Sequence, residues 1–131
     1  MKRKEIEFKF ILENPDVEKR KLECDKIINL CPEKIPIICE KDPECHNLEQ
    51  IDKTKFLVAN DLTVAQFYYV IRKKLNVNKE ESAFYLLVYG ANGIYAITGD
   101  ILLSQIYEKH KNPEDGFLYF VYTSQIVWGA E

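Results

Sequence analysis

Residues 55–75 read KFLVANDLTVAQFYYVIRKKL, and this run holds a strand pattern, a helix start signal and a helix pattern without interruption. The β-prone residues 56–58 are followed by the polar pair at residues 60–61, which ends the extended pattern. Thr63 and Gln66 have the spacing of a capping box. We therefore predict a strand, a turn and then a helix that begins at Thr63.

The predicted helix has a second start signal and a clear buried face. Leu62 and Phe67 have the spacing of a hydrophobic staple around the cap. Residues 72–74 are basic and complement the negative end of the helix dipole. The apolar residues that recur at helical spacing predict a core-facing stripe of Val64, Phe67, Val70, Ile71 and Leu75.

Composition narrows the class of protein. A chain of 131 residues with 47% apolar and 30% charged content predicts one globular domain, residues 1–131, that buries a core without disulfides or metal. Its 18 basic and 21 acidic residues are well mixed, which argues against nucleic-acid binding. No run approaches the roughly 18 apolar residues of a membrane-spanning helix, and the N-terminal residues lack the apolar region of a secretory signal. We expect a cytoplasmic protein.

The four cysteines are expected to be reduced thiols. Their spacing contains no CxxC pair and matches no zinc template: they are Cys24, Cys31, Cys39 and Cys45. His46 stands beside a cysteine, but it lies in a polar stretch that resembles no nucleophile motif. The sequence therefore predicts no metal site, no cofactor and no catalytic residue.

Two elements are predicted before the central run. Residues 3–12 fit a short helix or an extended arm equally well. Asn14 as the cap and Pro15 as the first helical residue predict a helix that Pro32 ends. Its predicted buried stripe is Val17, Cys24, Ile27, Ile28 and Cys31, and its other faces carry Lys19, Arg20, Lys21, Glu23, Asp25 and Lys26.

Residues 35–40 form a strand pattern that contains Pro36. Because proline cannot donate a ladder hydrogen bond, we expect this strand either to lie at a sheet edge or to begin there. A free edge is either protected by charges or used by an extended peptide that joins the sheet as an additional strand. The sequence leaves both uses open, and the second predicts that a peptide binds along residues 35–40.

The rest of the chain predicts two strands and a helix. Residues 84–89 are a continuous apolar run typical of a central strand, and the glycine-punctuated residues 90–99 predict an irregular segment. Residues 101–110 suggest a short helix with a solvated His110, and residues 117–123 the last strand. This order predicts an α+β fold, most economically a β-grasp, and the residues alone indicate a binding domain.

Four separated blocks, EKRKLECDKI, IPIICEK, DLTVAQFYYVIRKKL and DGFLYFVYTSQIVWG, resemble the autophagic ubiquitin-like modifiers, in both the GABARAP-like and the microtubule-associated light-chain branches. The resemblance spans about residues 10–129. It implies a ubiquitin-like β-grasp with two additional N-terminal helices and a protein that is not itself an enzyme. On this basis residues 1–31 are expected to be the helical extension, residues 32–123 the β-grasp core and residues 124–131 a flexible tail.

The resemblance also implies two apolar pockets for short linear motifs, which have an aromatic residue and an aliphatic residue three positions later. The matching residues for the aromatic pocket are Glu23, Ile27, Pro36, Ile38, Lys55, Leu57 and Phe117. Those for the aliphatic pocket are Phe56, Val58, Leu62, Phe67 and Val70. Lys53, Lys55 and Lys74 match basic positions that meet acidic residues flanking the motif.

Three departures from the family pattern bear on these expectations. Ala59 stands where the family usually has proline, which is expected to loosen the aliphatic pocket. Lys74 replaces the usual arginine and loses the fork geometry of a guanidinium. Residues 89–100 form a longer segment than is typical of the family.

The resemblance implies that a cysteine protease removes Ala130 and Glu131, and that activating and conjugating enzymes then link Gly129 to phosphatidylethanolamine. The expected location is the cytoplasm, and the autophagosome membrane after lipidation. Expected partners are motif-containing cargo receptors and adaptors, with microtubule contacts through residues 1–7 left open. The alternatives are a non-conjugated interaction module in membrane trafficking and, more remotely, a thiol enzyme.

Overall fold

The structure of the chain, a computed structural model, describes residues 2–3, 5–75, 83–126 and 128–129. The helices are α1 (Lys9–Glu13), α2 (Val17–Leu30), α3 (Val64–Leu75) and α4 (Leu103–His110). The strands are β1 (Lys2–Arg3), β2 (Lys34–Lys41), β3 (Lys55–Ala59), β4 (Tyr85–Gly90), β5 (Gly93–Ile97), β6 (Leu118–Thr123) and β7 (Trp128–Gly129).

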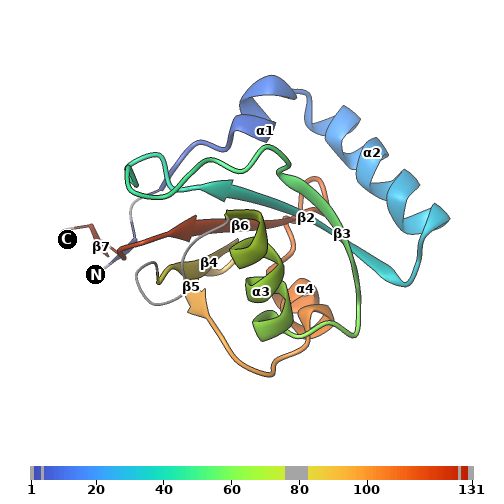
Figure 1. The fold of residues 1–131 in the computed structure, drawn as a ribbon. Coiled ribbons are helices and arrows are strands. Elements are labelled where there is room, and N and C mark those ends of the chain that lie inside the picture. Colours follow the sequence, from blue (N-terminus) through green and yellow to red (C-terminus); the bar gives the residue numbers. More distant parts are fainter. Residues whose placement is uncertain (1, 4, 76–82, 127, 130–131) are drawn as a thin grey trace.

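The main sheet is mixed and has the strand order β3-β2-β6-β4-β5. Strands β2 and β6 are parallel, and the other neighbours are antiparallel. Figure 1 shows α1 and α2 on one face of this sheet and α3 and α4 on the other. The α+β prediction is confirmed: α3 and α4 complete a β-grasp, and α1 and α2 are the two additional N-terminal helices.

Each face of the sheet has its own apolar core. On the α3 face, the ring of Phe67 lies 5.7 Å from that of Phe56 and 5.4 Å from that of Phe120. On the α2 face, the ring of Phe117 lies 5.1 Å from that of Phe10, and Cys24 joins the same cluster. The side chains of β6 alternate between these two cores, which makes β6 the central strand.

The start of α3 is as predicted, whereas α2 begins differently. The Thr63 N–H donates to Gln66 Oε1 at 2.9 Å, and the Gln66 N–H donates to Thr63 Oγ1 at 3.2 Å, so both bonds of the capping box are present. The prediction that Asn14 caps α2 is wrong. Asp16 is the cap and accepts from the Glu18 N–H at 3.0 Å, while Asn14 ends α1 and donates to Phe10 O.

Of the two positions predicted for residues 35–40, the sheet edge is wrong, because β2 lies between β3 and β6, whereas Pro36 does lie near the start of the strand. The position of Pro36 explains how proline fits an internal strand. The Cys39 N–H donates to Thr54 O on the β3 side, so the alternation of strand amides turns the Pro36 nitrogen toward β6. The parallel ladder with β6 begins at Ile37, one residue later, so Pro36 removes no bond from it.

Three further predictions for the second half of the chain are corrected. Residues 93–97, expected to be irregular, form β5, which pairs antiparallel with β4 and places Gly90 opposite Gly93. Strand β4 is internal, but β6 and not β4 is central. His110 is half-buried and not fully solvated: its Nδ1 is buried without a hydrogen-bond partner among the described residues, and its ring packs against Gly90.

Residues 128–129 form a short strand near the C-terminus. The backbone of β7 pairs antiparallel with β1, with Lys2 opposite Gly129. Figure 1 shows both chain ends together at one end of the sheet. Ala130 and Glu131, the predicted removable cap, lie outside the described residues.

Candidate functional site

Strand β3 is an edge of the main sheet, with β2 as its neighbour on one side. Its side chains alternate between the two faces. Phe56 is buried in the core beneath α3, and Val58 packs against the same core. Lys55 instead reaches Glu23 of α2, with which it forms an ion pair. The outer backbone of β3 therefore lies between an α2 side and an α3 side.

The α2 side contains the residues predicted for the aromatic pocket, and these residues differ in how far they are buried. Ile38 and Phe117 are fully buried and form the floor, and Pro36 is buried near them. Ile27 is half-buried on α2. Leu57 is 42% exposed on β3. A ligand therefore meets Leu57, Ile27 and the Glu23–Lys55 pair before it reaches the floor.

Phe10 belongs to this side of the site but was missed from the sequence. Lys55 Nζ lies 5.4 Å from the centroid of the Phe10 ring. Helix α1 is held there by Glu40, whose carboxylate accepts from the Lys9 N–H at 2.7 Å and the Phe10 N–H at 2.9 Å. Glu40 is the one carboxylate in the apolar pattern of residues 35–40, and a buried carboxylate needs hydrogen-bond donors. This was the signal in the sequence that another segment, here α1, docks at Glu40.

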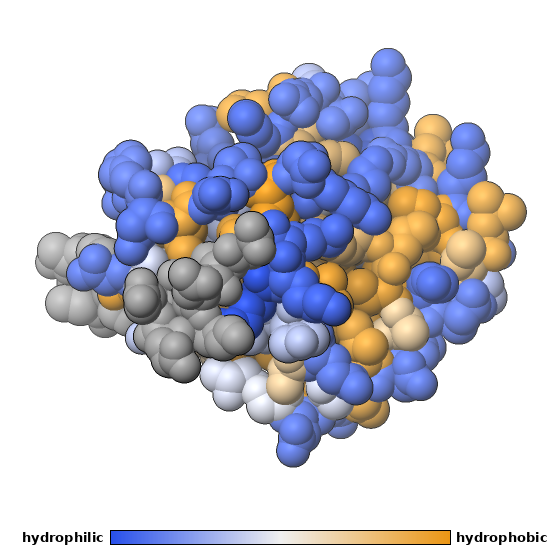
Figure 2. All heavy atoms as spheres, viewed as in Figure 1, coloured by the Kyte–Doolittle hydropathy of each residue, from blue (hydrophilic) through white to orange (hydrophobic). Residues whose placement is uncertain are grey.

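The α3 side contains the residues predicted for the aliphatic pocket. Phe56 and Phe67 are buried beneath, and Val58, Leu62 and Val70 are half-buried around them in one cluster. Figure 2, viewed as Figure 1, shows hydrophobic residues gathered over β3 and beside α3, with hydrophilic residues around them. The structure thus brings both predicted sets together, but on opposite sides of one edge strand.

Lysines surround the edge strand. Lys53 Nζ lies 5.5 Å from the centroid of the Phe56 ring, and Lys74 Nζ lies 5.9 Å from the same centroid. Both lysines are exposed. Together with Lys55 on the other side, they give the margin of the site a positive potential that favours an acidic ligand.

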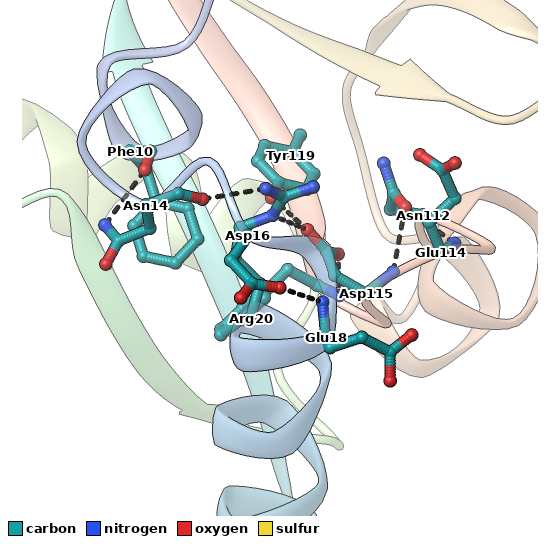
Figure 3. A network of polar contacts seen from close by, with 10 residues as sticks. Phe10, Asn14, Asp16, Glu18, Arg20, Asn112, Glu114, Asp115 and Tyr119 are labelled. Atoms are coloured by element: carbon teal, nitrogen blue, oxygen red, sulfur yellow. Dashed lines mark hydrogen bonds and ion pairs between the residues drawn. The ribbon is translucent and has the colours of Figure 1, made fainter.

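A buried ion pair positions α2, the outer wall of the aromatic set. Arg20 Nε donates to Asp115 Oδ2 at 2.9 Å, and Arg20 Nη1 donates to Asn14 O at 2.7 Å (Figure 3). Asp115 also accepts from the Tyr119 hydroxyl and, at 2.9 Å, from the Phe117 N–H. Burial lowers the pKa of Arg20, but the hydrogen bond to Asp115, together with the charge interactions with Tyr119 and Asp115, raises that pKa overall. The predicted outward position of Arg20 is therefore wrong.

The cysteines are free thiols in different environments. Burial raises the pKa of Cys24 to about 11. At Cys45 burial acts in the same direction, but hydrogen bonds to Ser124, and to backbone groups nearby, lower the pKa overall. His46 is exposed, and the hydrogen-bond partners of the Cys45 thiol are Asn47 and Ser124, so the described geometry supplies it with no base.

Neither a metal cluster nor a membrane span is found in the part of the chain that the structure describes. Among those residues, histidine, cysteine and carboxylate side chains form no group of three or more that could hold a metal ion. No described helix is long and apolar enough to cross a membrane.

Comparison with known proteins identifies the family. Residues 19–129 match the family model described as "Autophagy protein Atg8 ubiquitin like". The chain is 44% identical to autophagy-related protein 8 of Schizosaccharomyces pombe over 113 residues, which cover 86% of this chain and 88% of that protein. It is 43% identical to autophagy-related protein 8e of Arabidopsis thaliana over 115 residues, or 88% of each chain. The chain therefore belongs to the Atg8 family of ubiquitin-like autophagy proteins.

Proposed function

We propose that this chain is a ubiquitin-like modifier that is conjugated through Gly129 to phosphatidylethanolamine on autophagosomal membranes, where it recruits cargo receptors and adaptors through short linear motifs. The observation that carries the recruiting function is the edge strand β3 with an apolar set on each side. In this role the chain is a substrate of a processing protease and of conjugating enzymes, and not an enzyme itself.

The geometry of β3 matches the spacing of the proposed motif. Alternate residues of a strand point to opposite faces, so residues at positions i and i+3 of an added strand also point to opposite faces. An aromatic residue would enter the α2 side, and the aliphatic residue three positions later would enter the α3 side. Acidic residues before the motif would meet Lys53 and Lys74. Backbone hydrogen bonds to β3 provide affinity, and the two apolar sets provide specificity.

Entry of the aromatic side chain requires a small rearrangement. The Glu23–Lys55 ion pair spans the α2 side, and these two side chains are 36% and 41% exposed. An exposed ion pair contributes at most about 1 kcal/mol. Micromolar binding corresponds to about 8 kcal/mol, so opening this pair is a minor cost. Lys55 is then available to an acidic group of the ligand.

Conjugation would proceed at the C-terminus. Cleavage after Gly129 releases Ala130 and Glu131 and creates a carboxylate, which is adenylated, transferred as a thioester and joined by an amide bond to the lipid amine. A residue without Cβ adopts backbone conformations closed to other residues, which suits a narrow enzyme channel. The two acyl chains make attachment stable, whereas the free protein would remain cytoplasmic.

The experiment follows wild-type and Gly129→Ala proteins in native cells in which autophagy is induced. We expect the wild type to lose Ala130 and Glu131 by mass and to enter the membrane fraction with the added mass of the lipid. Gly129→Ala should stay soluble at full mass. A wild-type protein that keeps both residues and remains soluble would leave the non-conjugated interaction module in membrane trafficking as the function.

For this function we also propose that the chain is divided into three parts. Residues 1–31 would act as a helical extension, residues 32–123 as the β-grasp core, and residues 124–131 as the tail that the enzymes handle. Because Gly129 pairs with Lys2 in the structure, this two-residue ladder would have to open before processing.

A further inference from the structure

Strand β5 forms the opposite edge of the sheet. Its sequence, GIYAI at residues 93–97, contains no charged residue and no proline. In the described parts of the chain its backbone pairs with β4 alone. Tyr95 is 44% exposed, and Ala96 is also exposed. Natural edge strands are normally blunted by charges, prolines or bulges, and the other edge, β3, carries Lys55.

The sequence of β5 is complementary to itself. In an antiparallel pairing centred on Tyr95, Ile94 lies opposite Ala96 of a second copy, and Gly93 lies opposite Ile97. If the two copies are related by a two-fold axis perpendicular to the sheet, their α4 faces lie on the same side of the combined sheet. The two Tyr95 rings then become cross-strand neighbours on that face. The ring of Tyr95 covers Gly93 of its own chain, since a Cβ at position 93 would lie 3.1 Å from the Tyr95 hydroxyl oxygen. Tyr95 would therefore turn away from Gly93 to let Ile97 of the other copy pack there.

The charges at the two ends of β5 are also complementary. At its start, Lys109 lines a hollow with Asn92, Tyr95 and Glu108, and Lys111 follows on the same segment. At its end, the chain turns toward α3, where Gly99 O accepts from the Ala65 N–H, and the next residue is the exposed Asp100. Antiparallel pairing would set the end of β5 that leads to Asp100 in one copy beside the end that Lys109 borders in the other. The two-fold symmetry would repeat this arrangement at the other end.

From these three features we infer that β5 is the dimerisation edge of this protein, and that its partner is a second copy of the same chain. The two sheets join through β5, and the two β3 strands become the outer edges of the combined sheet. Each copy thus keeps its β3 edge open. The inference uses the sheet order and the charges at β5, and it stands whether or not the peptide site or the lipidation proposal holds.

Analytical ultracentrifugation of the full chain under reducing conditions tests the inference. From micromolar to near-millimolar concentration, the mass of the wild type should rise from 15.4 kDa toward twice that value. Tyr95→Lys places two like charges opposite each other and should abolish the rise. Because Tyr95 also donates to Asn92 O, circular dichroism must show that this variant is folded.

A charge exchange provides the second variant and its control. Asp100→Lys should raise the dissociation constant about tenfold by placing it against Lys109, and the double variant Asp100→Lys with Lys109→Asp should restore it. Glu13→Lys makes the same change of charge on α1 and should leave dimerisation unchanged. The inference is overturned if the wild type stays at 15.4 kDa, which would leave β5 to a peptide of another protein. It is equally overturned if the dimer persists undiminished in Tyr95→Lys and Asp100→Lys.

Discussion

Arg20 of α2 and Asp115 of the turn before β6 form an ion pair of 2.9 Å, although they lie 95 residues apart in the chain. Their side chains are only 6% and 0% exposed. The pair fixes α2 to the segment that carries Phe117, the floor of the proposed aromatic pocket. The position of that pocket wall therefore depends on a contact remote from any ligand.

Removing one member of this pair should destabilise the protein strongly. Asp115→Ala leaves the Arg20 guanidinium buried without its carboxylate, and breaking a buried pair in this way costs about 3–5 kcal/mol. Asp25→Ala removes the partner of Lys21 in an exposed pair whose side chains are 53% and 50% exposed, and should cost less than about 1 kcal/mol. Denaturant unfolding measures both changes. Equal losses in the two variants would contradict the structural role of Asp115.

Gly116→Ala should be more destabilising than Gly99→Ala. Both residues have positive φ, 86° and 89°, so alanine strains the backbone at either site by about 1 kcal/mol or more. A Cβ at position 116 would also lie 2.9 Å from Cys24 Sγ, whereas a Cβ at position 99 meets no atom within 4 Å. Adding Cys24→Ala to Gly116→Ala should recover part of the difference in unfolding free energy. No recovery would show that the sulfur contact is not the cause.

His110 should make the protein less stable at acidic pH. Burial, and secondarily Lys109, lowers the pKa of His110 in the folded protein below its ordinary value of 6.5. The unfolded chain therefore binds a proton first as pH falls below 6.5, and stability decreases until the lower folded pKa is reached. His110→Gln should reduce the loss of unfolding free energy between pH 7 and pH 5, and His46→Gln on an exposed loop should not. The reverse ranking of the two variants would contradict this origin.

Local signals in the sequence predicted local structure well. The capping box of Thr63 and Gln66 depends on two residues three positions apart, and both of its bonds are present. The predicted start of α2 was wrong because Asn14 and Asp16 are both good caps. Only the carboxylate of Asp16 reaches the Glu18 N–H. The residue sets on either side of β3 were chosen from a family resemblance. The structure places the whole aliphatic set in one cluster, and Ile27, Ile38 and Phe117 of the aromatic set in the other.

Errors arose where a remote partner decides the structure. Pro36 suggested an edge, but its nitrogen faces β6 before the β6 ladder begins at Ile37, so proline removes no bond there. Arg20 looked like a surface residue because Asp115 cannot be assigned to it from the sequence. Strand β5 was hidden by its flanking glycines, since pairing with β4 and not residue propensity makes it a strand.

The N-terminal arm should slow processing at the C-terminus. Because Lys2 pairs with Gly129 through the backbone, deletion of residues 1–4 should increase the rate of the proposed cleavage after Gly129. The control is Lys2→Ala with Arg3→Ala, which keeps the backbone donors and acceptors and should retain the wild-type rate. Mass spectrometry of timed samples measures cleavage. An unchanged rate after the deletion would show that the ladder does not restrict access.

The central claim is that β3 and the two apolar sets beside it bind an extended peptide. The most direct measurement is an amide chemical-shift titration of the full chain with a peptide in which acidic residues precede an aromatic residue, two spacers and an aliphatic residue. We predict that the largest shifts fall on residues 55–59, with further shifts around Ile27 and Val70, and that Leu57→Ala weakens binding. Shifts that concentrate on β4 and β5 while β3 stays unchanged would contradict the claim.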